Sequence, residues 1–294
     1  MSLNFTTPSL YIGFWHILDK LSEQIKIPTQ LTYRAVGSGT GISEFLGKDI
    51  PKDSGINDYK AYNDWGSGDI PISAEDRTTW NNEGIEFVQL PFVLSAVSFF
   101  HSIPGVPNGQ GGLNMTACLL ARVFDGDITM WDHEDIAEIN PSLDVPKNYP
   151  IFVGRRVLGS SSTYSITNYL YAQCPRGLDN PKGWPVDKVG SEIMWDESTN
   201  ECDGSSAMTA CLVNNEGAIG YIDSAHGHEE DLNEIALTNG DGIFLTAKDA
   251  GKEGIQAAAT DLSDAPESAD GDFSSMAFYN KVSMVDCVFY TFKA

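Results

Sequence analysis

Long apolar segments are missing from this sequence of 294 residues. No apolar run approaches the roughly 18–20 residues that a membrane-spanning helix requires. The most apolar stretch, residues 87–100, is interrupted by Gln89, Pro91, Ser95 and Ser98, a pattern typical of a buried strand. The start, MSLNFTTPS, also lacks the basic residues and the apolar stretch of a signal peptide. We therefore expect either a cytosolic chain or a mature domain without its leader, and we favour the mature domain.

Basic residues are scarce, with 18 Lys and Arg against 41 Asp and Glu, so the net charge is −23. This balance excludes nucleic acid as a partner, because binding to a phosphate backbone needs a positive surface. It does not exclude a small anion, which local backbone dipoles and one arginine can hold. The acidity itself leaves two readings open, adaptation to a saline environment and ordinary solubility.

Cysteine is also rare, with five in the chain, and no CxxC pair or Cys/His spacing suits zinc. Cys174 and Cys202 lie in polar contexts, QCPRG and NECDG, which predict a surface disulfide between them in an oxidising compartment. Cys118 and Cys211 lie in apolar, helix-like contexts and are predicted to be core residues. The odd count leaves at least one thiol without a cysteine partner in the chain.

Catalytic and nucleotide-binding motifs are absent as well. The Gly-Ser-Ser-Ser segment at residues 159–162 does not form G-x-S-x-G, and the five histidines flank no obvious nucleophile. The glycine loops complete neither the P-loop nor the dinucleotide fingerprint. The cluster around His226 and His228 is interpreted as a solvated acidic loop rather than a metal site. We therefore predict no enzyme, no cofactor and no metal, and a hydrolase remains a minor alternative.

Strand and helix patterns alternate along the chain, which predicts α/β sheets. The chain leaves one lobe near Pro91 and returns near Tyr221. The predicted lobes are therefore a discontinuous one, residues 1–92 and 222–294, and a continuous one, residues 93–221.

The most informative local pattern is a small polar loop that opens directly into an amphipathic helix, and it occurs three times. Helix N-termini carry unpaired N–H groups and a partial positive charge, so each is suited to an anion. Glycine permits close backbone approach, hydroxyls add short hydrogen bonds, and an arginine adds a planar charged fork. The loops and the helices that follow them are residues 4–7 and 8–26, 37–41 and 42–46, and 154–163 and 164–173.

Four segments in a fixed order, residues 33–41, 64–73, 155–163 and 216–221, resemble motifs of the phosphate-binding protein family of bacterial ABC importers. The resemblance extends over nearly the whole chain. It implies a type II periplasmic-binding-protein fold, in which two α/β lobes with mixed sheets flanked by helices enclose a ligand cleft between them.

The resemblance also implies the ligand set. Phe5 would donate its backbone N–H, Ser38 its N–H and hydroxyl, and Arg156 a charged fork. Asp69 would accept a proton from the ligand, which favours monohydrogen phosphate over sulfate because sulfate has no proton to donate. The complete implied set is Asn4, Phe5, Ser38, Asp69, Arg156, Ser160, Ser161 and Ser162.

Three departures from the family pattern concern this set. Asn4 stands where a small hydroxyl residue is usual, and Ser161 and Ser162 replace a Gly-Thr pair. Leu158 replaces an aspartate that normally partners the arginine. These changes leave altered affinity or a different oxyanion open.

The function predicted from sequence is the binding of inorganic phosphate, or a similar tetrahedral oxyanion, in an interlobe cleft by a receptor or uptake component. The alternative is a secreted or organellar interaction or scaffold protein that keeps the fold with an altered site. The expected partners are phosphate and a membrane transporter or surface partner. We expect a monomer that is secreted, periplasmic or extracellular.

Overall fold

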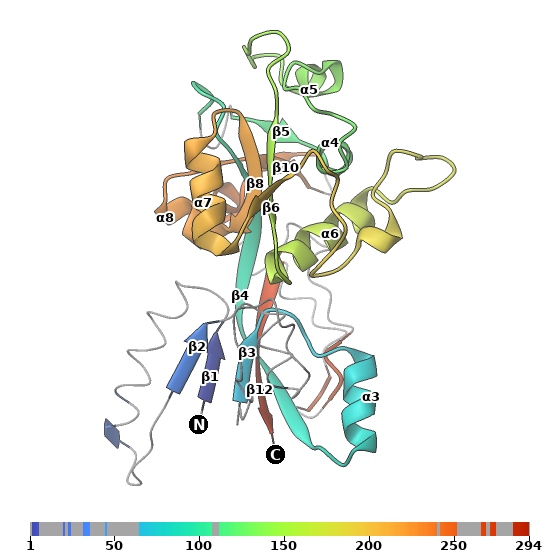
Figure 1. Ribbon diagram of the computed structural model, residues 1–294, viewed down its shortest axis with the longest axis vertical. Coiled ribbons are helices and arrows are strands. Elements are labelled where there is room, and N and C mark those ends of the chain that lie inside the picture. The colour runs from blue at the N-terminus through green and yellow to red at the C-terminus, as the bar shows by residue number, and fades with distance from the viewer. Residues whose placement is uncertain are drawn as a thin grey trace. The chain divides into compact units, whose positions relative to one another are not determined.

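The computed structural model describes residues 65–107, 112–239 and 242–251, together with shorter pieces of the remaining chain (Figure 1). Those pieces are residues 2–5, 20, 23–24, 32–35, 45, 266–268, 271–274 and 285–293. The loop at residues 37–41 and most of the two helices predicted at 8–26 and 42–46 lie outside the described residues. No helix among the described residues is long and apolar enough to cross a membrane.

Contacts divide the chain into two compact units. Unit 1 consists of residues 1–93, 262–276 and 287–294, and unit 2 consists of residues 94–261 and 277–286. Residues 222–261, which the sequence assigns to the first lobe, group with unit 2 in this division. The exact limits of the two lobes stay a prediction.

Unit 1 contains short strands and one well-described helix. Strands β1 and β2 pair in parallel, and β3 pairs antiparallel with β12, with Gly68 opposite Phe289. Helix α3 begins after Ser73, whose side chain accepts a hydrogen bond from the Asp76 N–H, and it buries Trp80 against Phe87. The elements are β1 (Ser2–Phe5), β2 (Thr32–Ala35), β3 (Trp65–Gly68), α3 (Ala74–Asn82) and β12 (Val285–Lys293).

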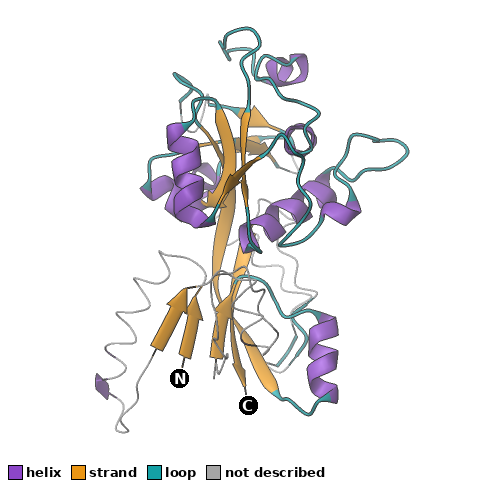
Figure 2. Ribbon diagram, in the orientation of Figure 1, coloured by secondary structure: helices purple, strands orange, loops and turns teal. Residues whose placement is uncertain are grey.

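Unit 2 contains a mixed sheet with helices beside it (Figure 2). Strand β4 (Phe87–His101), which enters from unit 1, pairs antiparallel with β8 (Ala218–Asp223). Strand β8 pairs in parallel with β6 (Phe152–Arg156), and β6 pairs in parallel with β7 (Asn200–Cys202). The first five residues of β8, AIGYI, are all buried, as expected for a strand that is covered on both faces.

The helices and shorter strands of unit 2 complete its core. Helix α4 has a clear apolar stripe, with Leu120, Val123 and Phe124 fully buried, and its N-cap Thr116 accepts from the Leu119 N–H. The α/β class and the mixed sheets predicted from the sequence are confirmed. The remaining elements are α4 (Ala117–Phe124), β5 (Asn114–Met115), α5 (Glu134–Ile139), α6 (Ser161–Gln173), the 3-10 helix η2 (Val186–Lys188), α7 (Gly204–Asn214), α8 (Ser224–Glu229), β9 (Asn233–Glu234), β10 (Ala236–Thr238) and β11 (Phe244–Leu245).

The cysteine pairing corrects the sequence-based prediction. Cys118 bonds to Cys174 and Cys202 bonds to Cys211, so the predicted Cys174–Cys202 disulfide is wrong. Cys174 and Cys202 are each 1% exposed, whereas Cys118 is exposed. The prediction relied on the polar residues beside each cysteine. Cys174 caps the end of α6 and Cys202 ends β7, and at both places the neighbouring residues are exposed while the cysteine is buried.

Candidate functional site

Four of the predicted ligand residues lie together in unit 2, at the junction of β6 and α6. Strand β6 ends at Arg156, and α6 begins at Ser161 after the N-cap residue Ser160. The exposed fractions of Ser160, Ser161 and Ser162 are only 3%, 8% and 8%. The junction therefore places buried hydroxyls at a helix N-terminus within six residues of an arginine.

The start of α6 is held firmly from outside the helix. The Ser160 N–H donates to the Ser191 carbonyl at 2.9 Å, and Thr167 bonds to both backbone groups of Gly190 at 3.1 Å. The Ser160 side chain makes no capping hydrogen bond. Because the first N–H groups of a helix have no carbonyl partner within it, this terminus is suited to an anion.

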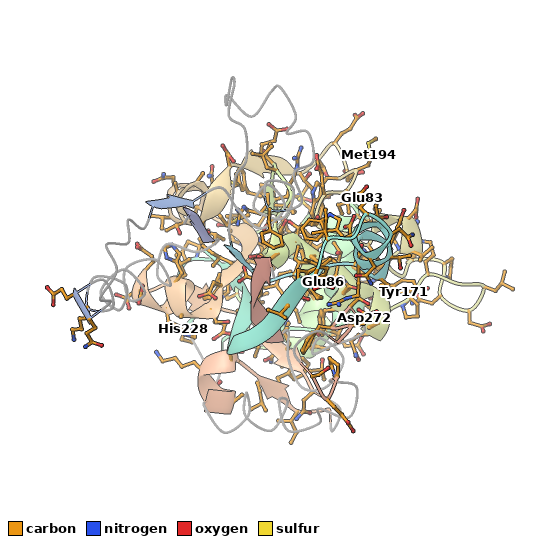
Figure 3. The ribbon with its side chains drawn as sticks, turned by 90° about the horizontal axis from the view of Figure 1, so that it is seen from below. Glu83, Glu86, Tyr171, Met194, His228 and Asp272 are labelled. Atoms are coloured by element: carbon orange, nitrogen blue, oxygen red, sulfur yellow. A yellow bond between two sulfur atoms is a disulfide. The ribbon has the colours of Figure 1, made fainter. Side chains whose placement is uncertain are left out.

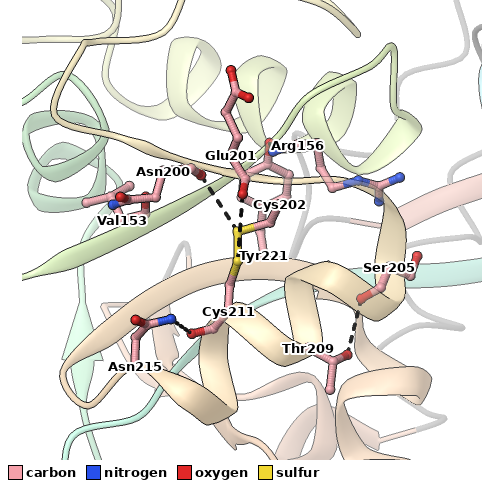
Figure 4. Close-up of a disulfide and its surroundings, with 10 residues drawn as sticks. All are labelled: Val153, Arg156, Asn200, Glu201, Cys202, Ser205, Thr209, Cys211, Asn215 and Tyr221. Atoms are coloured by element: carbon pink, nitrogen blue, oxygen red, sulfur yellow. Dashed lines mark hydrogen bonds between the residues drawn. A yellow bond between two sulfur atoms is a disulfide. The ribbon is translucent and has the colours of Figure 1, made fainter. Parts of the chain in front are cut away.

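The two adjacent arginines of β6 have different surroundings. Arg155 donates from Nη2 to Glu201 Oε1 at 3.0 Å. The half-buried Arg156 has no ion pair with any residue that the structure describes, and its buried Nε has no hydrogen-bond partner there. Figure 4 shows the Arg156 guanidinium extending away from the Cys202–Cys211 disulfide. Burial lowers the pKa of Arg156, and the negative charge of Asp203 acts in the opposite direction.

A buried guanidinium without an anionic partner is electrostatically incomplete. Arg156 makes no ion pair with a described residue, and the buried hydroxyls and helix N–H groups at the start of α6 carry no negative charge that could neutralise it. An oxyanion would supply both the negative charge and acceptors for the fork. The chemistry of the junction is therefore that of an anion-binding half-site.

Tyr221 is a residue of this half-site to which sequence reasoning assigned no role. Its hydroxyl accepts from the Arg156 N–H at 3.1 Å and shares a hydrogen bond with Thr163 Oγ1 at 2.7 Å. The available signal was a tyrosine within the apolar run of residues 218–222, because a buried phenol needs a polar partner.

The other four predicted residues belong to unit 1. Asn4 and Phe5 lie in β1, where Phe5 is in register with Ala35 of β2. Asp69 directly follows β3 and is 7% exposed. Strand β1 lies beside β3, so Asn4, Phe5 and Asp69 come from neighbouring strands. Ser38 lies outside the described residues, and the full ligand set stays a prediction.

The histidine cluster corrects another expectation. Residues 224–229 form α8 rather than a solvated loop, and His228 Nε2 lies 2.7 Å from Oε2 of the buried Glu234 (His228 is labelled in Figure 3). His226 Nε2 lies 3.1 Å from Thr209 Oγ1. Both histidines therefore join local hydrogen-bond networks. No group of three or more His, Cys, Asp or Glu side chains suited to a metal occurs within the described ranges.

Residues 5–280 match the family model of the PBP superfamily domain. Among curated relatives, a phosphate-binding protein PstS of Haemophilus influenzae is 26% identical over 216 residues, which cover 74% of this chain and 56% of that protein. A phosphate-binding protein PstS of Methanocaldococcus jannaschii is 26% identical over 237 residues, 79% of this chain and 54% of that protein. The chain thus spans about half the length of the curated relatives it matches.

Solved structures share the fold at low identity. A high affinity periplasmic phosphate-binding protein bound with phosphate matches with a TM-score of 0.64 at 18% identity, over 99% of this chain and 80% of that one. A phosphate-binding protein from Stenotrophomonas maltophilia matches with a TM-score of 0.66 at 16% identity, over 100% of this chain and 79% of that one. The type II two-lobed fold class follows from these likenesses.

Proposed function

The chain belongs to the PBP superfamily, and on that premise we propose that it binds inorganic phosphate or a similar tetrahedral oxyanion without transforming it. The observation that carries this proposal is Arg156, a half-buried cation without an ion pair in the described structure, beside the buried serines that open α6. The chain would act as a receptor or uptake component. The names of its relatives support phosphate as the ligand.

The proposed site uses short-range attraction to overcome an unfavourable global charge. A chain of net charge −23 repels phosphate at long range, but salt screens that repulsion beyond about 8–10 Å. Inside the site, the guanidinium fork and the dipole of α6 act at hydrogen-bond distance. The ligand set that we propose is Asn4, Phe5, Ser38, Asp69, Arg156, Ser160, Ser161 and Ser162.

Phosphate added to ligand-free protein is expected to bind and to raise thermal stability as occupancy increases. A ligand at 100 times its Kd stabilises the native state by about 2.7 kcal/mol. Calorimetric titration of protein first stripped of phosphate by unfolding and refolding measures the binding, and a thermal scan measures the shift. Absence of both signals at millimolar phosphate would contradict the proposal and favour the interaction protein below.

Selectivity for phosphate over sulfate is expected to depend on Asp69. A buried carboxylate repels an anion unless that anion donates a proton to it, which monohydrogen phosphate does and sulfate does not. Asp69→Asn replaces the charge with an N–H donor at nearly constant volume. Titration of both anions against both proteins should show sulfate gaining relative to phosphate by tenfold or more. A phosphate-to-sulfate affinity ratio within twofold of the wild type would mean that Asp69 only shapes the turn after β3.

One alternative rests on Leu158, whose side chain is 52% exposed in the loop beside Arg156. The family pattern has an aspartate there, so the chain has lost the usual partner of its arginine. An interaction or scaffold protein with an altered site would tolerate this loss. In the structure, however, Arg156 makes no ion pair with a described residue and lies close in sequence to the buried serines that open α6, which supports a retained anion site.

The proposed setting is extracytoplasmic. Two disulfides in unit 2 support an oxidising compartment, where such bonds persist. A membrane transporter or surface partner and a monomeric state remain part of the same proposal.

A further inference from the structure

The Tyr221 hydroxyl joins the two elements that form the Arg156 half-site. It accepts a hydrogen bond from the backbone N–H of Arg156, at the end of β6, over 3.1 Å. It also shares a hydrogen bond of 2.7 Å with Oγ1 of Thr163, in the first turn of α6. One side-chain oxygen therefore connects the strand that carries the guanidinium to the helix that carries the serines.

Packing alone does not explain this hydroxyl. The Tyr221 ring lies among Phe99, Phe124 and Trp195, with ring centroids 6.4, 5.9 and 6.1 Å away. A phenylalanine would fill the same space without the cost of burying an O–H group. Tyr221 is fully buried, and burial raises its pKa to about 12, so the hydroxyl is neutral near pH 7 and keeps its proton.

The hydroxyl acts where β6 passes beyond its ladder with β8. The two strands pair Phe152 with Ala218 and Val153 with Ile219. Three residues later, the Arg156 N–H donates to a side chain of β8 instead of a backbone carbonyl. On its other edge β6 stays in register with β7, where Arg156 is opposite Cys202. The side-chain bond thus holds the Arg156 backbone at the end of the strand.

We propose that Tyr221 is a positioning residue for anion binding. It does not contact the anion but holds the backbone of Arg156 in a fixed relation to the N-terminus of α6. The guanidinium and the helix dipole then act on one oxyanion without a reorganisation cost on binding. This inference rests on the proposed phosphate-binding function.

Tyr221→Phe is expected to weaken phosphate binding about tenfold, because two hydrogen bonds that align the site are lost while the aromatic packing stays. Thr163→Val removes the second partner and should weaken binding severalfold, whereas Thr163→Ser keeps the hydroxyl and should preserve affinity. The double variant Tyr221→Phe/Thr163→Val should bind phosphate about as well as Tyr221→Phe alone, because both substitutions break the same link between β6 and α6. Tyr169→Phe, another buried tyrosine of unit 2, is the matched control and should leave the affinity unchanged.

A second measurement uses ligand-free protein. Amide hydrogen exchange at Arg156 should be faster in Tyr221→Phe than in the wild type and unchanged in Tyr169→Phe. If wild type and Tyr221→Phe bind phosphate equally, the positioning role is overturned and the proposed function stands. If wild type binds no phosphate, the proposed function fails, and unchanged exchange at Arg156 would in addition overturn the link between β6 and α6.

Discussion

Replacing Arg156 with alanine is expected to weaken phosphate binding by a factor on the order of a hundred or more. Each charge-assisted hydrogen bond contributes about 1.5–3 kcal/mol, and the guanidinium fork makes two of them with an oxyanion. The same change should leave the stability of ligand-free protein unchanged or raise it, because Arg156 is a half-buried cation without an ion pair in the described structure. Calorimetry with phosphate and urea unfolding without it measure the two effects.

Arg155 provides a matched control from the next position of the strand. Its guanidinium bonds to Glu201, whose side chain is 65% exposed, so Arg155→Ala should cost little stability. It should also leave phosphate affinity within about twofold of the wild type. Arg156→Lys should be intermediate, because lysine keeps the charge but not the planar fork. Equal losses of affinity in Arg155→Ala and Arg156→Ala would place the anion elsewhere.

Removal of the Cys118–Cys174 disulfide is expected to lower the free energy of unfolding by roughly 4 kcal/mol. This disulfide closes a loop of 56 residues, and the chain-entropy relation gives about that value for the freedom regained by the unfolded chain. The 9-residue loop of Cys202–Cys211 gives only about 2.5 kcal/mol. Urea unfolding of Cys118→Ser/Cys174→Ala, compared with Cys202→Ala/Cys211→Ser, measures the difference.

The loss of phosphate affinity should be larger in the variant without Cys202–Cys211, although the loss of stability is expected to be larger in the variant without Cys118–Cys174. Cys202 is in register with Arg156 on the neighbouring strand, whereas Cys118 and Cys174 join α4 to the C-terminal end of α6, remote in sequence from its anion-binding start. The Cys202–Cys211 variant should therefore lose more affinity. A larger stability loss from the short loop would show that native-state packing, rather than chain entropy, sets the contribution of each disulfide.

The half-site that we propose in unit 2 was accessible to sequence reasoning because its residues are close together in the sequence. Arg156 and the three serines lie within seven residues of one another, so a strand followed by a helix is enough to bring them together. The position of Asp69 could also be predicted from consecutive residues, because it directly follows the short strand β3 of unit 1. The remaining members, Asn4, Phe5 and Ser38, stay predictions from the resemblance.

Contacts between distant residues were not accessible in this way. The cysteine contexts suggested Cys174–Cys202, but the partner of each thiol depends on which helix packs beside α6 or β7. The histidines near residue 227 looked solvated, yet His228 meets Glu234 once β9 pairs with β4. For the cysteines and for the histidines alike, the residues next to them in the sequence do not determine which way their own side chains point.

The sequence by itself determined the α/β class and the family, and it predicted the anion-binding chemistry that we propose at the start of α6. These depend on periodicity, helix N-termini and short motifs, which are properties of consecutive residues. The tertiary structure alone decided the disulfide partners and the linkage of Arg156 to Thr163 through Tyr221. Tyr221 follows Arg156 by 65 residues, and only the pairing of β6 with β8 brings its hydroxyl to the Arg156 N–H.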